Sequence, residues 1–359
     1  MCEDSYGGNS RLSLLEALLM ARAPGGQENE VRAIAHREMV KYCDRVWTDA
    51  AGNLIGLIES ESPAATDSAA VKIMAHMDEI AMIVKRVEAD GALRVVALGG
   101  ANPVNFGVCP VDILVDDESL AGVLSFGSMH VTDESPQGKD VTSGAVQWKD
   151  VHVVTRLDEQ QLLAAGVRPG TRVVLSRHWR KPWRVNDAIA GHFMDDRAPI
   201  AAVIEAAALL ALRKGELQRD VYFVFTTMEE ESNSGAMYAA RSLPGDVCLA
   251  VEVAPVMPEY ATRLSIDPVI STGDQKAYYT KSVAEQLQRA GVRAGFSPQF
   301  ALLLDFASDA SAALAGGACP QTGCIAIPTE NTHGYEMVLP EAMGACARTL
   351  VEYLIDVGG

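Results

Sequence analysis

The sequence predicts an α/β protein in which a small all-β domain interrupts a larger α/β domain. Helical segments and apolar strand-like runs share both ends of the chain, from residue 11 to about 75 and from 196 to 355. Between these ends, short β-like runs punctuated by Gly and Pro follow one another with almost no helix. We therefore assign residues 1–85 and 186–359 to the α/β domain and residues 86–185 to the inserted domain.

The N-terminal part of the chain is predicted to form two helices and three strands. Leucines recur on one face of a helix over residues 11–22, and Pro24-Gly25-Gly26 ends it. A second helix is expected over residues 28–42. The strands follow at residues 46–48, 53–58 and 71–75.

The middle of the chain is typical of a barrel or sandwich. Its β-like runs are short and lie at residues 80–87, 93–98, 111–115, 123–126, 151–155 and 172–175. One short helix is expected near residues 158–165. This pattern predicts a self-contained all-β module.

The C-terminal part returns to the α/β pattern. An Ala-rich helix is expected over residues 197–213, with two more over 277–291 and 341–355. The apolar runs between them are continuous rather than alternating, which is typical of strands covered on both faces. These strands are predicted at residues 221–227, 247–253 and 324–327.

Composition excludes several classes of function. The 359 residues include 47 acidic and 30 basic side chains, a formal net charge of -17. Nucleic acids and anionic membranes both need clustered Lys and Arg, so we expect neither as a partner. Two acids precede the first apolar run, which argues against a secretory signal. The seven cysteines include no C-x-x-C pair, and we expect reduced thiols in the cytoplasm.

Polar residues stand where predicted strands end or where a helix begins. In open α/β sheets, functional groups gather beyond the carboxyl ends of the strands. Each residue alone has an ordinary explanation, such as a helix cap or a solvated acidic loop. Together, two histidines and several carboxylates predict a site for zinc, cobalt or manganese rather than magnesium or calcium. The residues are His76, Asp78, Asp195, Glu229, Glu230, Glu252 and His333.

The spacing of these residues suggests individual roles. His76 and Asp78 are two apart and share a face at a strand end, so Asp78 can orient the imidazole. Asp195 is a candidate to bridge two metals through its two oxygens. Glu229, beside a ligand, could take a proton from a metal-bound water whose pKa the metals lower. Which ligands share a metal stays open at this point, and one arrangement pairs Glu230 with His333 and His76 with Glu252.

The chain resembles the tetrahedral (TET-type) dinuclear-metal aminopeptidases, a family also labelled cellulase-M-like or glutamyl aminopeptidase-like. The resemblance covers about residues 10 to 355, and its segments follow the family's order. Any one segment is a weak match, but the ordered set is highly specific. The segments are AHMDEIAMIVKRVEADGALRVVALGG, GVLSFGSMH, GVRPGTRVVL, GHFMDDR, TTMEEESNSGA, LAVEVAP, SDASAA and IPTENTHGYEMV.

The resemblance implies a zinc-exopeptidase-type (phosphorylase/hydrolase-like) catalytic domain with a mixed sheet and an inserted PDZ-like β domain that serves dimerisation. It implies a homo-oligomer built from dimers, up to a tetrahedral dodecamer with its active sites facing an inner chamber. The implied activity is removal of N-terminal residues from short peptides. The implied cofactors are two divalent transition metal ions per chain, zinc first, with cobalt or manganese as alternatives.

The family's functional residues carry over to matching positions of this chain. Asp195 becomes the bridging ligand, with His76 and Glu252 on one metal and Glu230 and His333 on the other. The resemblance makes Glu229 the general base that activates a metal-bridging water and places Asp78 behind His76.

The sequence also departs from the family pattern. Glu252 stands where the family usually has Asp, which predicts a shifted metal geometry. Residues 231–234 read Glu-Ser-Asn-Ser where an apolar residue and Gly are common, so we expect a different loop path. Pro199 stands in the first turn of a helix, where Pro is tolerated. Residues 330–332 replace the usual aromatic or Arg residues before His333, and we expect altered specificity.

Three other functions are weighed against this expectation. A related metal-dependent amidase or deacylase would share the ligands but carry a different insert. A cellulase would work with two carboxylates and no metal, which leaves the histidines unexplained. A catalytically degenerate assembly protein would be expected to lack ligands or the base, and all of them are present.

Overall fold

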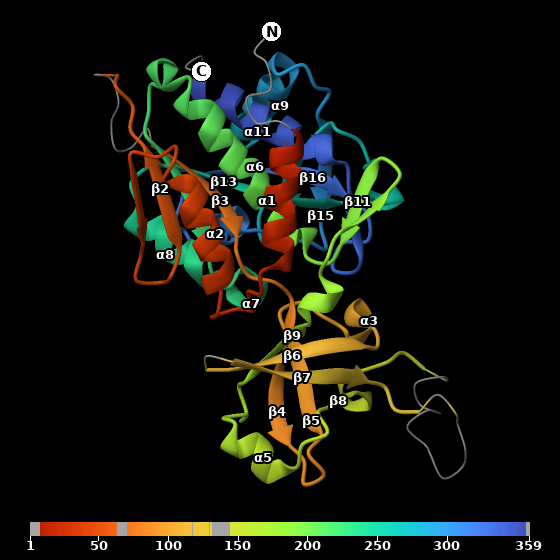
Figure 1. The fold of residues 1–359 in the computed structure, drawn as a ribbon. Helices are drawn as coiled ribbons and strands as arrows, with labels where there is room; N and C mark the ends of the chain where they lie inside the picture. Colours follow the sequence, from red (N-terminus) through yellow and green to blue (C-terminus); the bar gives the residue numbers. More distant parts are fainter. Residues whose placement is uncertain (1–7, 63–69, 117, 129, 131–143, 357–359) are drawn as a thin grey trace. The chain divides into compact units, whose positions relative to one another are not determined.

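The computed structural model describes residues 8–62, 70–116, 118–128, 130 and 144–356. The chain divides into two compact units, Met1–Asp78 with Pro182–Gly359, and Glu79–Lys181. Figure 1 shows that both ends of the chain belong to the first unit and that the second is a single insertion. The two domain boundaries predicted from the sequence, after residues 85 and 185, lie a few residues C-terminal to these boundaries.

An eight-stranded mixed sheet forms the centre of the first unit. Its strand order is β1-β2-β12-β3-β13-β16-β14-β15. The four strands from β12 to β16 run parallel, whereas β2 and β14 pair antiparallel at their flanks. The bounds are β1 Arg45–Thr48, β2 Leu54–Ile58, β3 Val71–His76, β12 Val221–Thr226, β13 Val247–Pro255, β14 Val269–Asp274, β15 Gln299–Leu303 and β16 Gln321–Thr329.

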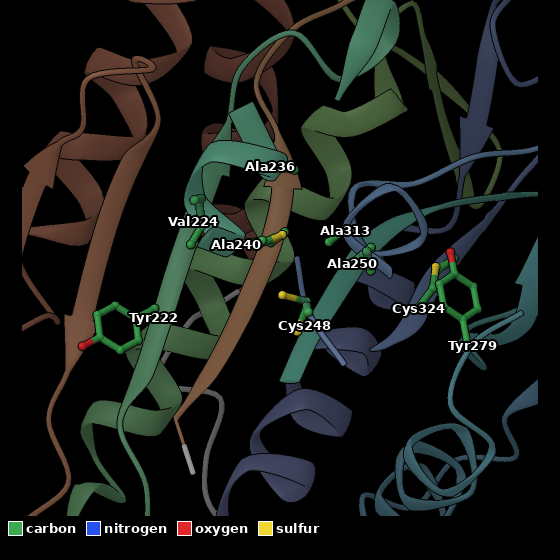
Figure 2. Close-up of a cluster of buried hydrophobic side chains, with 14 of the residues drawn as sticks. Tyr222, Val224, Ala236, Ala240, Cys248, Ala250, Tyr279, Ala313 and Cys324 are labelled. Atoms are coloured by element: carbon green, nitrogen blue, oxygen red, sulfur yellow. The ribbon is translucent and has the colours of Figure 1, made fainter. Parts of the chain in front are cut away.

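Helices cover both faces of this sheet (Figure 1). On one face, α8 (Ser234–Ser242) and α10 (Asp309–Ala315) pack through alanines such as Ala240 and Ala313. Figure 2 shows these small side chains beside Val224 and Ala250 of the sheet. The other face is covered by longer helices. The helices outside this pair are α1 Gly8–Met20, α2 Asn29–Met39, α6 Met194–Ala211, α7 Glu229–Ser232, α9 Lys281–Arg293 and α11 Pro340–Ile355.

The continuous apolar run in β12 follows from this two-sided cover. Tyr222 and Val224 belong to the cluster under α8 and α10, so the alternating Phe223 and Phe225 face the opposite helices. Every residue of β12 is buried. The sequence therefore predicts this strand well, because both faces of the strand are buried against helices and carry apolar side chains.

A small three-stranded sheet lies elsewhere in the first unit. It pairs β10 (Trp183–Val185), β11 (Ala188–Gly191) and β17 (Glu336–Val338). These strands are short, and the sequence does not predict them as a sheet. β14 and β15 are also not predicted from the sequence, and the helix between them, predicted to start at residue 277, begins at Lys281 as α9.

The second unit is a closed barrel with strand order β4-β5-β8-β7-β6-β9. Of the two predicted arrangements, barrel and sandwich, the barrel is therefore correct. Buried and half-buried residues alternate strictly along β6, as one-sided packing around a small core requires. Its bounds are β4 Ala81–Val87, β5 Leu93–Leu98, β6 Cys109–Val115, β7 Glu118–Ser125, β8 His152–Val154, β9 Arg172–Leu175, α3 Pro103–Phe106 and α5 Glu159–Ala164.

A membrane-spanning helix needs both sufficient length and high hydropathy. Within the described residues, none of the helices combines the length and apolar character needed to span a bilayer.

Candidate metal centre

Parallel strands bring most of the predicted residues to one edge of the large sheet. His76 is the last residue of β3, in register with Thr226 at the end of β12. The chain then turns through Met228, which has a left-handed φ of 55°, and α7 begins with Glu229 and Glu230. Glu252 lies on β13, the other neighbour of β3. Local strand pattern and parallel pairing together therefore gather these side chains.

The remaining two predicted ligands lie in segments that adjoin the small sheet. Asp195 follows β11, and its backbone dihedral angles are not helical although it stands in the first turn of α6. His333 lies in the turn between β16 and β17 and has a positive φ of 62°. Both side chains come from irregular backbone, which repeating sequence patterns describe poorly.

These residues form two groups of possible metal ligands that share Asp195. In each group the ligand atoms lie within 4.8 Å of one another. Nε2 of His76 lies 2.8 Å from Oδ1 of Asp195, and Nε2 of His333 lies 3.4 Å from Oδ2. The two oxygens of one carboxylate thus face different histidines, which is the geometry of a bridging ligand. The groups are His76, Asp195, Asp196 and Glu252, and Asp195, Glu230 and His333.

The wider separations within each group leave room for a cation. Nε2 of His76 lies 4.0 Å from Oε2 of Glu252, and Nε2 of His333 lies 3.8 Å from Oε1 of Glu230. Ligand atoms that share one tetrahedral zinc ion lie ~3.4 Å apart, because each lies ~2.1 Å from the metal. The nitrogen and oxygen donors and their spacing therefore fit divalent transition metals.

Charge balance at the centre also calls for cations. Burial raises the pKa of Glu252 and Glu229 well above the usual range, and that of Glu230 to about 7. Burial also acts to raise the pKa of Asp195, but hydrogen bonds with His333 and His76 outweigh it and lower this pKa. The two imidazoles thus stabilise the anionic form of Asp195, but the negative charges of the other carboxylates are not fully balanced by nearby positive charge. Bound divalent cations would supply the missing positive charge.

Asp78 supports the centre in two ways. Its carboxylate lies 3.5 Å from Nδ1 of His76, and its carbonyl oxygen lies 3.2 Å from the same nitrogen. The carboxylate also accepts hydrogen bonds from the backbone N–H groups of Glu229 (2.9 Å) and Glu230 (3.0 Å). The sequence predicts the first contact, whereas the second, which holds the start of α7, is found only in the structure.

Three further residues hold the candidate ligands, and the sequence alone predicts a role for none of them. Glu336, almost fully buried, accepts hydrogen bonds from the backbone N–H groups of His333 (3.0 Å) and Asp195 (3.2 Å). Asp196 accepts one from the backbone N–H of His76 (2.9 Å). Arg197 donates to the carbonyl oxygens of Met77 and Asp78. The matched segments GHFMDDR and IPTENTHGYEMV contain all three, which was the available signal.

Comparisons with known proteins agree with this architecture. The profile of the M42 glutamyl aminopeptidase family matches residues 52–348. The lysyl aminopeptidase of Pyrococcus furiosus is 28% identical over 242 residues, which are 67% of this chain and 65% of that protein. SgcX of Escherichia coli (strain K12) is 28% identical over 244 residues, which are 67% of this chain and 62% of that protein. The aligned parts therefore span less than two thirds of these relatives.

Solved structures share the fold over nearly the whole chain. An aminopeptidase from the archaeon Desulfurococcus kamchatkensis superimposes with a TM-score of 0.85 at 24% identity, covering 98% of this chain and 96% of that one. The Pyrococcus horikoshii TET1 peptidase gives a TM-score of 0.82 at 21% identity, covering 97% and 99%. The family match covers most of the chain, and the resemblance noted from the sequence is confirmed. The chain belongs to the M42 glutamyl aminopeptidase family.

Proposed function

We propose that this protein is an aminopeptidase that uses two divalent metal ions to remove N-terminal residues from short peptides. The observation that carries the proposal is the position of Asp195, whose two carboxylate oxygens each face a different histidine. Membership of a peptidase family supports the same activity. The lysyl and other aminopeptidases among its relatives support the substrate class.

The proposed ligand sets follow from the geometry. His76, Asp195 and Glu252 would hold one ion, and Asp195, Glu230 and His333 would hold the other. Zinc suits these donors best, with cobalt or manganese as alternatives. Bound ions would polarise the scissile carbonyl and lower the pKa of a water molecule toward neutrality.

The chain's own residues would move the proton and position the substrate. Glu229 stands next to a ligand and would accept the proton of the attacking water, then deliver it to the leaving amine. Asp78 holds the backbone of Glu229 in place for this transfer. The chain's net charge of -17 would favour the approach of the protonated amino terminus of a peptide.

A panel of aminoacyl amides and short peptides, each free or N-acetylated, tests this proposal. The protein would be loaded in turn with zinc, cobalt and manganese. We expect release of N-terminal residues from the free peptides and no cleavage of the acetylated ones. Cleavage of only the acetylated set would instead identify an amidase or deacylase. Fewer than two tightly bound metals per chain, with no cleavage of any peptide after zinc or cobalt is added, would indicate a degenerate assembly protein.

The pH dependence of stability gives a prediction that needs no substrate. In the metal-free protein, burial raises the pKa of Glu230 to about 7 and that of Glu336 to about 8. Both carboxyls therefore bind protons more tightly folded than unfolded, so they favour folding at low pH. Their ionisation opposes folding as pH rises from the unfolded value near 4.5 through 7 and 8.

We therefore expect the melting temperature of the chelator-treated protein to fall by ~5 °C or more from about pH 5.5 to about pH 8, two values that lie within this range. Differential scanning calorimetry measures it. The metal-loaded protein serves as the control, since cations compensate the ionised carboxylates and should reverse the trend. Parallel pH profiles for the two forms would contradict the prediction.

Assembly is part of the proposal. We infer a homo-oligomer built from dimers, with the β-barrel unit as the dimerisation domain. The Pyrococcus horikoshii TET1 peptidase can assemble into a tetrahedron or a large octahedral shell, which supports this inference. The barrel unit also exposes Val104, Val108 and Val123. A single monomeric species in a sedimentation-velocity experiment would overturn the inference of a homo-oligomer. The cytoplasmic location stays a prediction.

A further inference from the structure

The segment after the proposed base departs from the family pattern, and the structure shows what one of its residues does. Asn233 ends α7 with φ 51° and ψ 26°, a left-handed conformation that Asn tolerates better than most residues. Its side chain is not solvent-exposed, because the residue is only 1% accessible. Asn233 therefore places a buried amide one helical turn from Glu229.

The Asn233 amide connects Glu229 to two other side chains. Its Nδ2 donates hydrogen bonds to Oε1 of Glu229 (2.5 Å) and to Oδ1 of Asp309 (3.1 Å). Its Oδ1 accepts a hydrogen bond from Nζ of Lys276. An ammonium group can only donate, so Lys276 orients Oδ1 toward itself and Nδ2 toward the carboxyl oxygens of Glu229 and Asp309.

Both partners of the amide are themselves held. The backbone N–H of Lys276 donates to the carboxylate of Asp274 (2.8 Å), which fixes the turn after β14. Asp309, almost fully buried, accepts a hydrogen bond from Oγ1 of Thr226 (2.5 Å) at the end of β12. The amide is therefore anchored from two directions before it reaches Glu229.

We propose that Asn233 and Lys276 are positioning residues for the general base. This inference rests on the proposed role of Glu229. Asn233 binds one oxygen of the Glu229 carboxylate and leaves the other for proton transfer. Lys276 orients the amide and polarises it, which strengthens the hydrogen bond that the amide donates. The pair thereby reduces the rotational freedom of the carboxylate that would otherwise cost catalytic efficiency.

Asn233→Gly is the most direct test, because Gly keeps the positive φ and removes only the amide. We expect kcat to fall by ~10- to 100-fold with KM within about twofold of wild type. Lys276→Met should also lower kcat, and Lys276→Arg should retain a higher kcat than Lys276→Met because it keeps a cationic donor. Asn186→Gly is the matched control, since Asn186 also has a positive φ (53°) but is exposed in the turn between β10 and β11. It should leave both constants unchanged.

A double-mutant cycle separates positioning from a purely structural role. If Asn233 acts through Glu229, Asn233→Gly should cause no further loss of kcat in a Glu229→Gln background. Metal content per chain should stay at the wild-type value in every variant. An equal loss in both backgrounds, or wild-type kcat in Asn233→Gly and Lys276→Met, would overturn the inference.

A crystal structure of the Asn233→Gly protein provides a readout that does not depend on turnover. We expect the Glu229 carboxylate to adopt a different rotamer or several, with the ligands unmoved. An unchanged Glu229 would refute the inference. Should the wild-type protein cleave none of the peptides, the proposed function fails, and this structural comparison still decides whether Asn233 positions Glu229.

Discussion

Glu229→Gln is expected to lower kcat by ~1,000-fold while the protein keeps its metal ions. The substitution preserves side-chain size, and its amide oxygen can still accept the hydrogen bond that Asn233 donates. It removes only the group that can take a proton at neutral pH. Steady-state kinetics on an aminoacyl amide and elemental analysis of the purified protein measure the two quantities.

Glu341→Gln is a suitable control for this experiment. Glu341 also lies in the first turn of a helix, but it is exposed at the start of α11. It should leave kcat and metal content unchanged. Near-wild-type activity of Glu229→Gln would show that another group accepts the proton.

Asp195→Ala is expected to weaken metal binding at both positions and to abolish measurable activity. Its Oδ1 and Oδ2 lie near His76 and His333 respectively, so one substitution removes a ligand from each group. Even loss of a residue behind a ligand lowers metal affinity by about 10- to 100-fold, so we expect at least ~100-fold at each position. Competition titrations against a chromogenic chelator measure the affinities.

Single-position variants make this prediction specific. Glu252→Ala and Glu230→Ala should each lower the affinity for one ion and leave the affinity for the other close to the wild-type value, because Glu252 and Glu230 belong to different groups of ligands. If Asp195→Ala loses only one ion, or none, Asp195 does not bridge. If Glu252→Ala weakens both, the assignment of ligands to two separate ions is wrong.

The large sheet shows how far local sequence predicts this fold. The runs that become β3, β12 and β13 are mostly apolar, with Lys72, His76 and Glu252 as the charged or ionisable exceptions, because helices cover both faces of these strands. This pattern can be recognised from the sequence alone. β15 is different: it is an edge strand with alternating exposure, and the short run QFALL carries too little periodicity to be recognised. The strands from β1 to β16 in the sheet order are accordingly predicted from the sequence, whereas β14 and β15 at the other side of the sheet are not.

The candidate site divides in the same way. The predicted ligands and base follow strand ends or begin a helix, so strand prediction alone brings His76, Glu230 and Glu252 to one edge. Resemblance to the family supplies the pairing about Asp195. Their metal and catalytic roles stay proposals until the variants above are measured.

The sequence by itself determined the α/β class, the interruption by a β domain and the side chains that could bind metal, because each depends on residues close together in the chain. Only the tertiary structure showed how these side chains are held. Glu336 meets Asp195 across 141 positions of sequence, and Lys276 meets Asn233 across 43. Such contacts arise from the packing of distant strands and turns, and no local periodicity encodes them. The Asn233 amide illustrates the difference: the sequence marked its segment as unusual, and the folded chain placed it against Glu229.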